Sequence, residues 1–153
     1  MVRVQSELFD PHEETARFQA GRLSAGALAS FIGTVRSNAD DRDVISLELE
    51  HYPGFTERRI AEIEADARTR FDVIDMLIIH RYGPMRPGET IVLVAALSAH
   101  RREALQAVDY LMDRLKTEAP FWKREVRPDG AEWIEPRRRD LEDRARWDEG
   151  ETT

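Results

Sequence analysis

Two long apolar runs rich in β-branched residues, 73–82 and 90–98, constrain the fold of this chain more than any other feature. Glycine and proline stand at both ends of the connector between them, 83–89, which indicates a tight, ordered loop. A third segment, 101–118, places its apolar side chains in one arc at about 100° per residue, as an amphipathic helix does. Pro120 disfavours helical geometry in the residue before it, so this helix is expected to end just before it.

Capping signals predict two further helices. Asp10 is a good N-cap, with Pro11 at the first helical position and acidic residues in the first turn, and Gly21 is a suitable stop. Thr56 is expected to cap another helix that runs to about Phe71. The chain is therefore expected to contain about three helices.

Shorter segments carry strand patterns. Residues 44–51 alternate, so Ile45, Leu47 and Leu49 are expected on one buried face. Gly33 within an apolar strand indicates a bulge or a close backbone approach. The expected strands are 2–7, 27–36, 44–51, 73–82, 90–98 and 132–135, with a polar, turn-forming loop at 37–43.

The order of these elements predicts one α+β domain over residues 1–153, with a mixed, mainly antiparallel sheet. Residues 136–153 show no apolar periodicity apart from Leu141 and Trp147. The basic run at 137–139 is balanced by neighbouring acids, which indicates a solvated surface. This last segment is expected to be a charged, flexible C-terminal tail.

Composition excludes several classes of protein. The net charge of −7 argues against a nucleic-acid binder, and no segment approaches the roughly 18 apolar residues of a membrane span. The chain has no cysteine, which excludes disulfides, thiolate metal sites and a cysteine nucleophile or persulfide. Its four histidines lack zinc-site spacing, so no metal or cofactor is expected, and His51 and His80 at strand ends are expected to be structural. No signal segment is recognised, so a cytoplasmic location is expected.

Lys116 and Lys123 flank a proline break and can converge on one pocket from different elements. Lys116 lies near the end of the amphipathic helix, and Lys123 follows the aromatic pair Phe121 and Trp122. Two cations placed in this way suit an anionic ligand. The alternative is that both lysines extend into solvent near a helix end, where the helix dipole favours cations.

Three other positions can add charge to such a site. Arg36 lies where an apolar strand gives way to a polar loop, which suits either a substrate contact or a surface ion pair. His100 and Arg101 lie at a helix start, where free N–H groups favour an anion, although His100 also fits an ordinary surface position. Arg124 adds a cation directly after Lys123. Each signal is weak alone, but together they supply cations from several separate elements.

Five segments together resemble the large, catalytic subunit of molybdopterin synthase. They are FIGTVR at 31–36, LEHYPG at 49–54, IHRYG at 79–83, SAHR at 98–101 and LKTEAPFWKRE at 115–125. They run in the family's order, and the last segment is the most specific. The resemblance implies an α/β-hammerhead-like fold and a homodimer within a heterotetramer.

The resemblance also implies a reaction. In that family a small ubiquitin-like subunit carries sulfur as a thiocarboxylate on its C-terminal Gly-Gly tail, which it inserts into the large subunit. The large subunit positions cyclic pyranopterin monophosphate, and two sulfur transfers create the dithiolene of molybdopterin. The absence of cysteine fits this chemistry, since the sulfur comes from another protein.

By resemblance, Lys116 lies nearest the thiocarboxylate and is the expected catalyst, and Lys123 is the second essential cation. The residues implied for the substrate pocket are Phe31, Thr34, Val35, Arg36, His100, Arg101, Met112, Arg124 and Glu125. His100 and Arg101 are expected to reach in from the second subunit of a dimer. Thr34 stands where many members of the family have a lysine.

A partly desolvated lysine among other cations has a lowered pKa, and it can stabilise an oxyanion and deliver a proton. Lys116 is therefore expected to act as an electrostatic and proton-donating group, although the helix C-terminus opposes the pKa shift. The competing hypothesis is a non-enzymatic module that docks a ubiquitin-like partner or a phosphate ligand. Such a scaffold would keep its output when Lys116 and Lys123 are neutralised, whereas an enzyme would keep binding and lose turnover.

Overall fold

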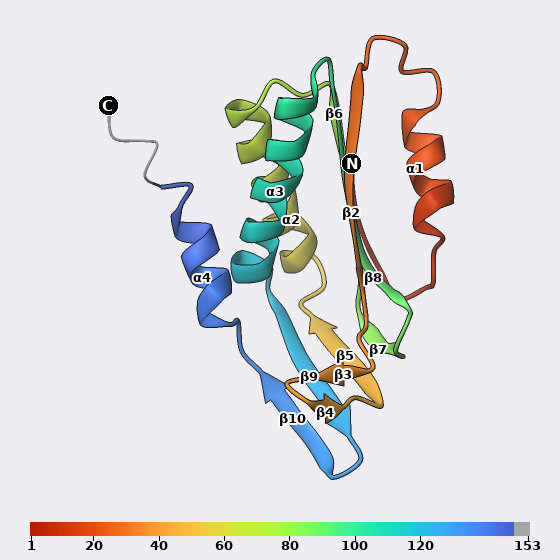
Figure 1. The fold of residues 1–153 in the computed structure, drawn as a ribbon, viewed down its shortest axis with the longest axis vertical. Coiled ribbons are helices and arrows are strands. Elements are labelled where there is room, and N and C mark those ends of the chain that lie inside the picture. Colours follow the sequence, from red (N-terminus) through yellow and green to blue (C-terminus); the bar gives the residue numbers. More distant parts are fainter. Residues whose placement is uncertain (149–153) are drawn as a thin grey trace.

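The computed structural model describes residues 1–148, which are arranged around two four-stranded sheets (Figure 1). The helices are α1 (Pro11–Gln19), α2 (Phe55–Arg70), α3 (Arg101–Glu118) and α4 (Arg138–Ala145). The strands are β1 (Val2–Gln5), β2 (Ala27–Thr34), β3 (Asn38–Ala39), β4 (Arg42–Asp43), β5 (Ser46–His51), β6 (Asp75–Arg81), β7 (Gly83–Met85), β8 (Thr90–Ser98), β9 (Phe121–Arg127) and β10 (Gly130–Ile134). Within the described part of the chain, no helix has the length and apolar character needed to cross a membrane.

The first sheet has the strand order β1-β6-β8-β2. β1 is parallel to β6, whereas β8 is antiparallel to both of its neighbours. The predicted single α+β domain with a mixed, mainly antiparallel sheet is therefore confirmed. β6 and β8 lie at the centre, with α1 on one face and α2 and α3 on the other, which explains their nearly continuous apolar sequences (Figure 1).

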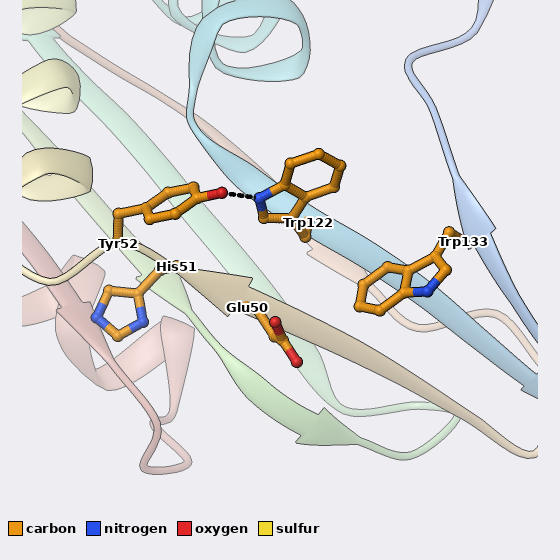
Figure 2. Close-up of a pocket in the computed structure, with 5 residues that line it drawn as sticks. All are labelled: Glu50, His51, Tyr52, Trp122 and Trp133. Atoms are coloured by element: carbon orange, nitrogen blue, oxygen red, sulfur yellow. Dashed lines mark hydrogen bonds between the residues drawn. The ribbon is translucent and has the colours of Figure 1, made fainter.

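The second sheet has the order β10-β9-β5-β7 and is antiparallel throughout. One of its faces carries Leu47, Leu49 and Met85, which belong to a small buried cluster. The other face carries the exposed side chains of Trp122 and Trp133 (Figure 2). The second sheet is therefore amphipathic, and its exposed face carries large aromatic side chains.

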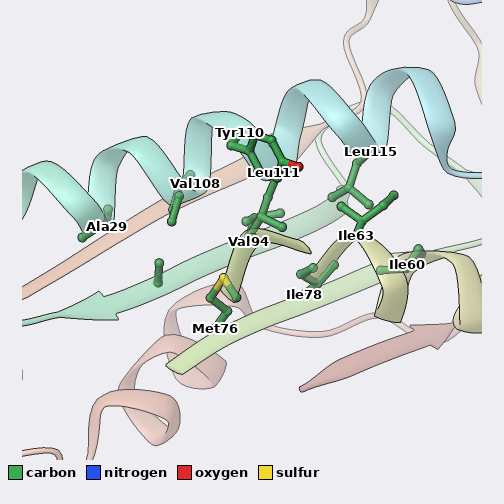
Figure 3. Close-up of a cluster of buried hydrophobic side chains, with 14 of the residues drawn as sticks. Ala29, Ile60, Ile63, Met76, Ile78, Val94, Val108, Tyr110, Leu111 and Leu115 are labelled. Carbon is green, nitrogen blue, oxygen red and sulfur yellow. The ribbon is translucent and has the colours of Figure 1, made fainter. Parts of the chain in front are cut away.

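The main core lies between the first sheet and helices α2 and α3 (Figure 3). Met76, Ile78 and Val94 of the two central strands pack in one cluster with Ile63 of α2 and Leu111 of α3, and all five side chains are fully buried. Alternate residues of the same strands point to the opposite face, where they pack with α1. Side chains that alternate along the two apolar runs thus fill the core on both faces of the first sheet.

The start of α2 differs from the prediction. Gly54, with a positive φ of 81°, is the N-cap in place of Thr56, and its N–H donates to the Glu57 carboxylate at 2.7 Å. The fully buried Thr56 hydroxyl instead accepts a hydrogen bond from the N–H of Tyr52 at 2.9 Å. The predicted cap was wrong because the threonine bonds backward to the turn and lies inside the helix.

The strand after the polar loop begins later than predicted, at Ser46. Ile45, expected on the buried face, is 54% exposed because regular alternation begins only after it. Leu47 and Leu49 are buried as predicted. The polar loop itself forms the short β3–β4 hairpin, and the connector 83–89 contributes β7 to the second sheet.

Gly33 lies where the pairing of β2 with β8 becomes irregular. The register shifts between Gly33 and Thr34, and a Cβ on Gly33 would lie 2.8 Å from Cγ1 of Val92. Both the bulge and the close approach predicted for this glycine are confirmed. After the bulge, the N–H of Val35 donates to the carbonyl of Glu89 at 3.0 Å.

The charged segment after β10 contains a fourth helix that the sequence did not indicate, α4. Trp147, just beyond it, packs edge-on against Tyr110 and Phe71, with ring centroids 5.3 and 5.9 Å away. One tryptophan thus anchors a helix that has no fully buried side chain of its own, and such an anchor leaves no periodicity in the sequence. The rest of the predicted tail, 149–153, lies outside the described residues.

Candidate active site

Lys116 lies in the last turn of α3, with its side chain exposed. The helix ends at Ala119, whose N–H donates to the carbonyl of Leu115 at 3.3 Å. Pro120 then leads the chain directly into β9, so the predicted helix end is confirmed. This break lets Lys116 on the helix approach Lys123 on the strand.

Lys123 lies in the interior of the second sheet, between Ile134 of β10 and Leu49 of β5. Its side chain is half-buried, and this burial lowers the pKa of the ammonium group. The positive charge of Lys116 lowers that pKa further, whereas the Glu125 carboxylate opposes the shift. The two lysines are therefore near enough for their charges to interact.

Two arginines add to this site. The charges of Arg137 and Arg36 also lower the pKa of Lys123. The four basic residues come from the end of α3, from β9, from the segment after β2 and from the segment before α4. We call Arg36, Lys116, Lys123 and Arg137 the cationic cluster. Since like charges repel, this arrangement favours the binding of an anion among them.

An ion-pair network around Glu118 holds the end of α3. Its carboxylate accepts hydrogen bonds from Arg59 at 2.8 Å and Arg144 at 2.9 Å, and another from Arg114. Burial alone would raise the pKa of Glu118, but the bonds from Arg114 and Arg144 outweigh it, so the pKa is lowered. The network joins α2, α3 and α4 close to Lys116, and it fixes the turn that presents this lysine.

Stacked rings connect the two sheets near the cationic cluster. His80 of β6 stacks on Phe121 of β9 with ring centroids 4.1 Å apart, and His51 of β5 stacks on Tyr82 at 3.8 Å. His51 and Phe121 are register partners in the second sheet, so the four rings link β6 to β5 and β9. Both histidines therefore pack between sheets, which agrees with the structural role predicted for them.

His80 also interacts electrostatically with Lys116 of the cationic cluster. Burial lowers the pKa of its imidazole to about 4, with a further contribution from the charge of Lys116 and an opposing one from the hydrogen bond to the Arg81 carbonyl. That carbonyl oxygen lies 2.9 Å from Nδ1. The ring is therefore neutral at neutral pH, with Nδ1 as the donor to the carbonyl.

Alternation along β9 separates two of the predicted residues. Glu125 lies on the same strand face as Lys123 and is buried against Arg127, with 2.5 Å between carboxylate and guanidinium. Arg124 lies on the opposite face and pairs with Glu48 at 3.0 Å. Within one chain, the structure therefore brings Glu125 to the side of Lys123 but does not bring Arg124 there.

His100 and Arg101 are exposed at the start of α3. Lys116 follows Arg101 by fifteen residues, a separation of roughly 22 Å along the helix axis at about 1.5 Å per residue. Within one chain, these two residues do not contact the cationic cluster. That a second subunit contributes them to the site stays a prediction.

The remaining predicted residues differ in exposure. The Val35 side chain is buried in the small cluster of the second sheet, and its N–H and carbonyl are hydrogen-bonded to Glu89 and Gly88. Thr34 and Arg36, on either side of it, are exposed. Phe31 is 41% exposed on β2, and Met112 packs against the main core about one turn before Lys116 on α3.

Sequence reasoning missed one member of the cationic cluster and one of its neighbours. Arg137 is exposed, as expected of a solvated basic run, yet its charge acts on Lys123. The β9–β10 hairpin pairs Lys123 with Ile134, and Arg137 follows three residues later. His80 reaches the site only through the contact between sheets. Neither proximity leaves a pattern in the sequence.

A two-sheet α+β fold with a cationic cluster next to the sheet contact has the charge that suits an anionic ligand. Comparison with known proteins makes this class specific. Residues 4–118 match the family described as MoaE protein, and the chain belongs to this family.

Similar proteins align with this chain over nearly its whole length. A molybdopterin synthase catalytic subunit from Ralstonia nicotianae is 51% identical over 146 residues, covering 95% of this chain and 83% of that protein. The one from Caulobacter vibrioides is 50% identical over 149 residues, covering 97% and 98%. The solved structure of a molybdopterin biosynthesis MoaE protein from Burkholderia ambifaria is similar with a TM-score of 0.82 at 44% identity, covering 97% of both chains.

Proposed function

We propose that this chain is the catalytic subunit of a molybdopterin synthase, a sulfurtransferase of molybdenum cofactor biosynthesis in the cytoplasm. It transfers sulfur from the C-terminal thiocarboxylate of a small ubiquitin-like subunit to cyclic pyranopterin monophosphate and forms the dithiolene of molybdopterin. The approach of Lys116 to Lys123 in the cationic cluster carries this proposal. Membership of a family whose relatives are named as catalytic subunits of this enzyme supports it.

The cationic cluster matches the charge of both proposed substrates. The thiocarboxylate tail and the phosphate of the pterin are anions, and the cluster offers positive charge from four separate places in the chain. Lys116 is exposed and accessible to an incoming tail. Lys123 is half-buried, and partial removal of water strengthens its interaction with a bound anion.

The lysines also have roles in the reaction. When the thiocarboxylate sulfur attacks the substrate, negative charge develops on oxygen and a leaving oxygen needs a proton. We assign Lys116 to the tail, as the main electrostatic and proton-donating group. The lowered pKa of Lys123 makes it a better proton donor than an ordinary lysine, so it can share this task.

The substrate pocket in this proposal surrounds the two lysines. Its members from one chain are Phe31, Thr34, Val35, Arg36, Met112 and Glu125. Arg124 is left outside this set, because it pairs with Glu48 on the other face of β9. Neutralising Arg124 is therefore expected to affect turnover less than neutralising Arg36.

We further propose that a second copy of the chain supplies His100 and Arg101. Both lie at a helix N-terminus, where free N–H groups favour an anion, and both are too far from Lys116 to act in their own chain. The enzyme is then a homodimer that carries two small subunits. Mixing one chain that lacks the Lys116 ammonium with one that lacks the Arg101 guanidinium should restore activity in part of the mixed dimers.

Sulfur transfer in a purified mixture tests the proposed function. The mixture contains this protein, its thiocarboxylated small subunit and cyclic pyranopterin monophosphate. Wild type and Arg138→Ala, a control at an exposed position on α4, are expected to form molybdopterin. Lys116→Ala is expected to form the complex, but its turnover should be slower than that of wild type by about 100-fold or more. A well-formed wild-type complex without product would favour the scaffold hypothesis.

Lys116→Arg separates the charge of this residue from its proton. Arginine keeps the positive charge, but its pKa is too high for proton transfer near neutral pH. The variant is expected to bind the small subunit normally and to lose most of its turnover. Near-normal turnover would mean that charge alone suffices, and the proton-donating role would then be wrong.

A further inference from the structure

A cleft of about 340 Å³ opens on the exposed face of the second sheet (Figure 2). It is lined by Glu50 and His51 of β5, Tyr52 just after that strand, Trp122 of β9 and Trp133 of β10. Trp122 precedes Lys123 in β9, so the two side chains project from opposite faces of the sheet. The cleft is therefore separate from the cationic cluster and has no part in the proposed sulfur transfer.

Three aromatic side chains of the cleft are held in place although they are exposed. Tyr52, Trp122 and Trp133 are 46%, 55% and 54% exposed. The two indoles meet edge-to-face, with centroids 6.4 Å apart and planes at 82°, and the indole N–H of Trp122 donates to the Tyr52 hydroxyl (Figure 2). The tryptophans thus form two adjacent walls at nearly a right angle, ordered before any ligand binds.

Glu50 gives the cleft a negative charge. It is the register partner of Trp122 and lies on the same face of β5 as Glu48. The Glu48 carboxylate pairs with Arg124 at 3.0 Å, whereas Glu50 forms no ion pair with any of residues 1–148. An unpaired carboxylate beside two π faces attracts a cation and repels an anion.

Trp133 already contacts one cation within the chain. The guanidinium carbon of Arg124 lies 5.8 Å from the centroid of the Trp133 ring, a cation–π distance. Because Glu48 balances the charge of Arg124, this pair adds no net charge to the cleft. The charge available to a ligand is therefore that of Glu50.

We propose that the cleft is an aromatic cage that binds the guanidinium group of an arginine projecting from a partner protein, against Trp122 and Trp133 and paired with Glu50. Arginine is favoured over lysine because its planar, weakly hydrated head stacks on aromatic rings and meets a carboxylate in a fork. A protein is favoured over a free small molecule because the cleft opens onto the exposed face of a sheet, where a projecting side chain can enter. Tryptophan and arginine are also the residues that dominate binding energy at protein interfaces.

The indole N–H signals in a proton–nitrogen NMR spectrum test this proposal directly. The chain has three tryptophans, and Trp147, packed against Tyr110 and Phe71, is an internal control. A blocked Gly-Arg-Gly peptide is expected to shift the Trp122 and Trp133 signals in a saturable way and to leave Trp147 unchanged. A matched Gly-Gln-Gly peptide is expected to shift none. Equal responses to both peptides, or no response to either, would overturn the proposal.

Variants assign the binding to the named residues. Glu50→Gln is expected to weaken peptide binding about fivefold, since an exposed ion pair beside a cation–π contact contributes on the order of 1 kcal/mol. Glu142→Gln, which removes an exposed carboxylate of α4, is expected to leave binding unchanged. Trp133→Leu is expected to abolish the response of Trp122, and an unshifted Trp147 signal reports that the variant is folded. Undiminished binding to Glu50→Gln would contradict the cage.

Sedimentation distinguishes a partner protein from a second copy of this chain. Wild type and Trp133→Leu are expected to show the same association state at equal concentration, because the cage is assigned to a different protein. Dissociation of the variant alone would mean that a second copy fills the cleft. That result would overturn the assignment to a partner.

Discussion

The first and second sheets differ in what covers them. The central strands of the first sheet have apolar side chains on both faces, packed under helices on each side. The second sheet buries only a small apolar cluster, and it also holds Lys123, the buried Glu125–Arg127 pair and two exposed tryptophans. A thinly covered sheet can hold charges that are partly desolvated yet accessible, which a fully covered sheet cannot.

Helix α3 connects the two regions. Its apolar face packs on the first sheet through Leu111 and Leu115, and its last turn carries Lys116 toward the second sheet. The position of the proposed catalyst therefore depends on packing in the main core, away from the cationic cluster. The comparison predicts that stability and turnover respond to substitutions in different parts of the molecule.

The largest effect on stability is expected in the main core. Leu111→Ala removes a fully buried side chain between α3 and the first sheet and should lower the free energy of unfolding by about 2–5 kcal/mol. Leu105→Ala, on the same helix but 60% exposed, should change it by less than about 0.5 kcal/mol. Urea denaturation measures both. Equal effects would mean that the layered core is not the main source of stability.

His80 makes the contact between the sheets sensitive to acid. Its pKa is lowered from 6.5 to about 4 in the folded chain, so the unfolded chain binds its proton more readily between these values. The stability that it contributes is present above pH 6.5 and is lost as the pH falls toward 4, by about 3 kcal/mol in total.

His80→Phe tests this dependence, since it preserves a ring for stacking on Phe121 but removes the titrating group. The free energy of unfolding, measured at several pH values by denaturation, should fall less between pH 6.5 and 4 in the variant than in wild type. The same fall in both proteins would exclude His80 as its source.

Trp147 tests whether α4 is part of the folded domain. Trp147→Ala removes two edge-on ring contacts and a 2.7 Å hydrogen bond to Asp113, and it should cost about 1–3 kcal/mol of unfolding free energy. Leu141→Ala, at a 53% exposed position of α4, is the matched control and should cost less than about 0.5 kcal/mol. The midpoints of thermal unfolding of the two variants, each compared with wild type, measure this difference. An unchanged midpoint for Trp147→Ala would mean that α4 adds nothing to stability.

The smallest effect concerns the interaction between the two lysines. Lys116→Ala removes a like charge, so the pKa of Lys123 should rise, as followed by an NMR titration of its side chain. Arg138→Ala, at an exposed position where the arginine pairs with Glu142, is the control and should leave that pKa unchanged. If the pKa of Lys123 were the same in Lys116→Ala as in wild type, the two lysine charges would not interact, and the proposed cationic cluster would be contradicted.

Much of the fold is readable from local patterns. The end of the helix at 101–118 followed from Pro120, and the bulge at Gly33 followed from glycine in an apolar strand. The two apolar runs became the central strands because burial on both faces demands continuous apolar sequence. These features depend on residues close together in the chain.

The missed features depend on contacts between distant segments. β9 begins with two aromatic residues followed by three charged ones, which is no strand pattern, and it is a strand because it pairs with β5 and β10. α4 depends on one tryptophan docking onto α3, and Arg137 joins the cationic cluster because a hairpin returns the chain beside Lys123. The resemblance to a family, carried by short motifs, indicated Lys116 and Lys123 where spacing alone left an ordinary surface interpretation open.

The most direct measurement is the single-turnover rate of sulfur transfer by Lys123→Ala, made together with its free energy of unfolding. Replacing a half-buried lysine among other cations should leave the unfolding free energy within about 1 kcal/mol of wild type and slow transfer by roughly 100-fold or more. Transfer at the wild-type rate by a stable, complex-forming Lys123→Ala protein would contradict the assignment of the reaction to the cationic cluster.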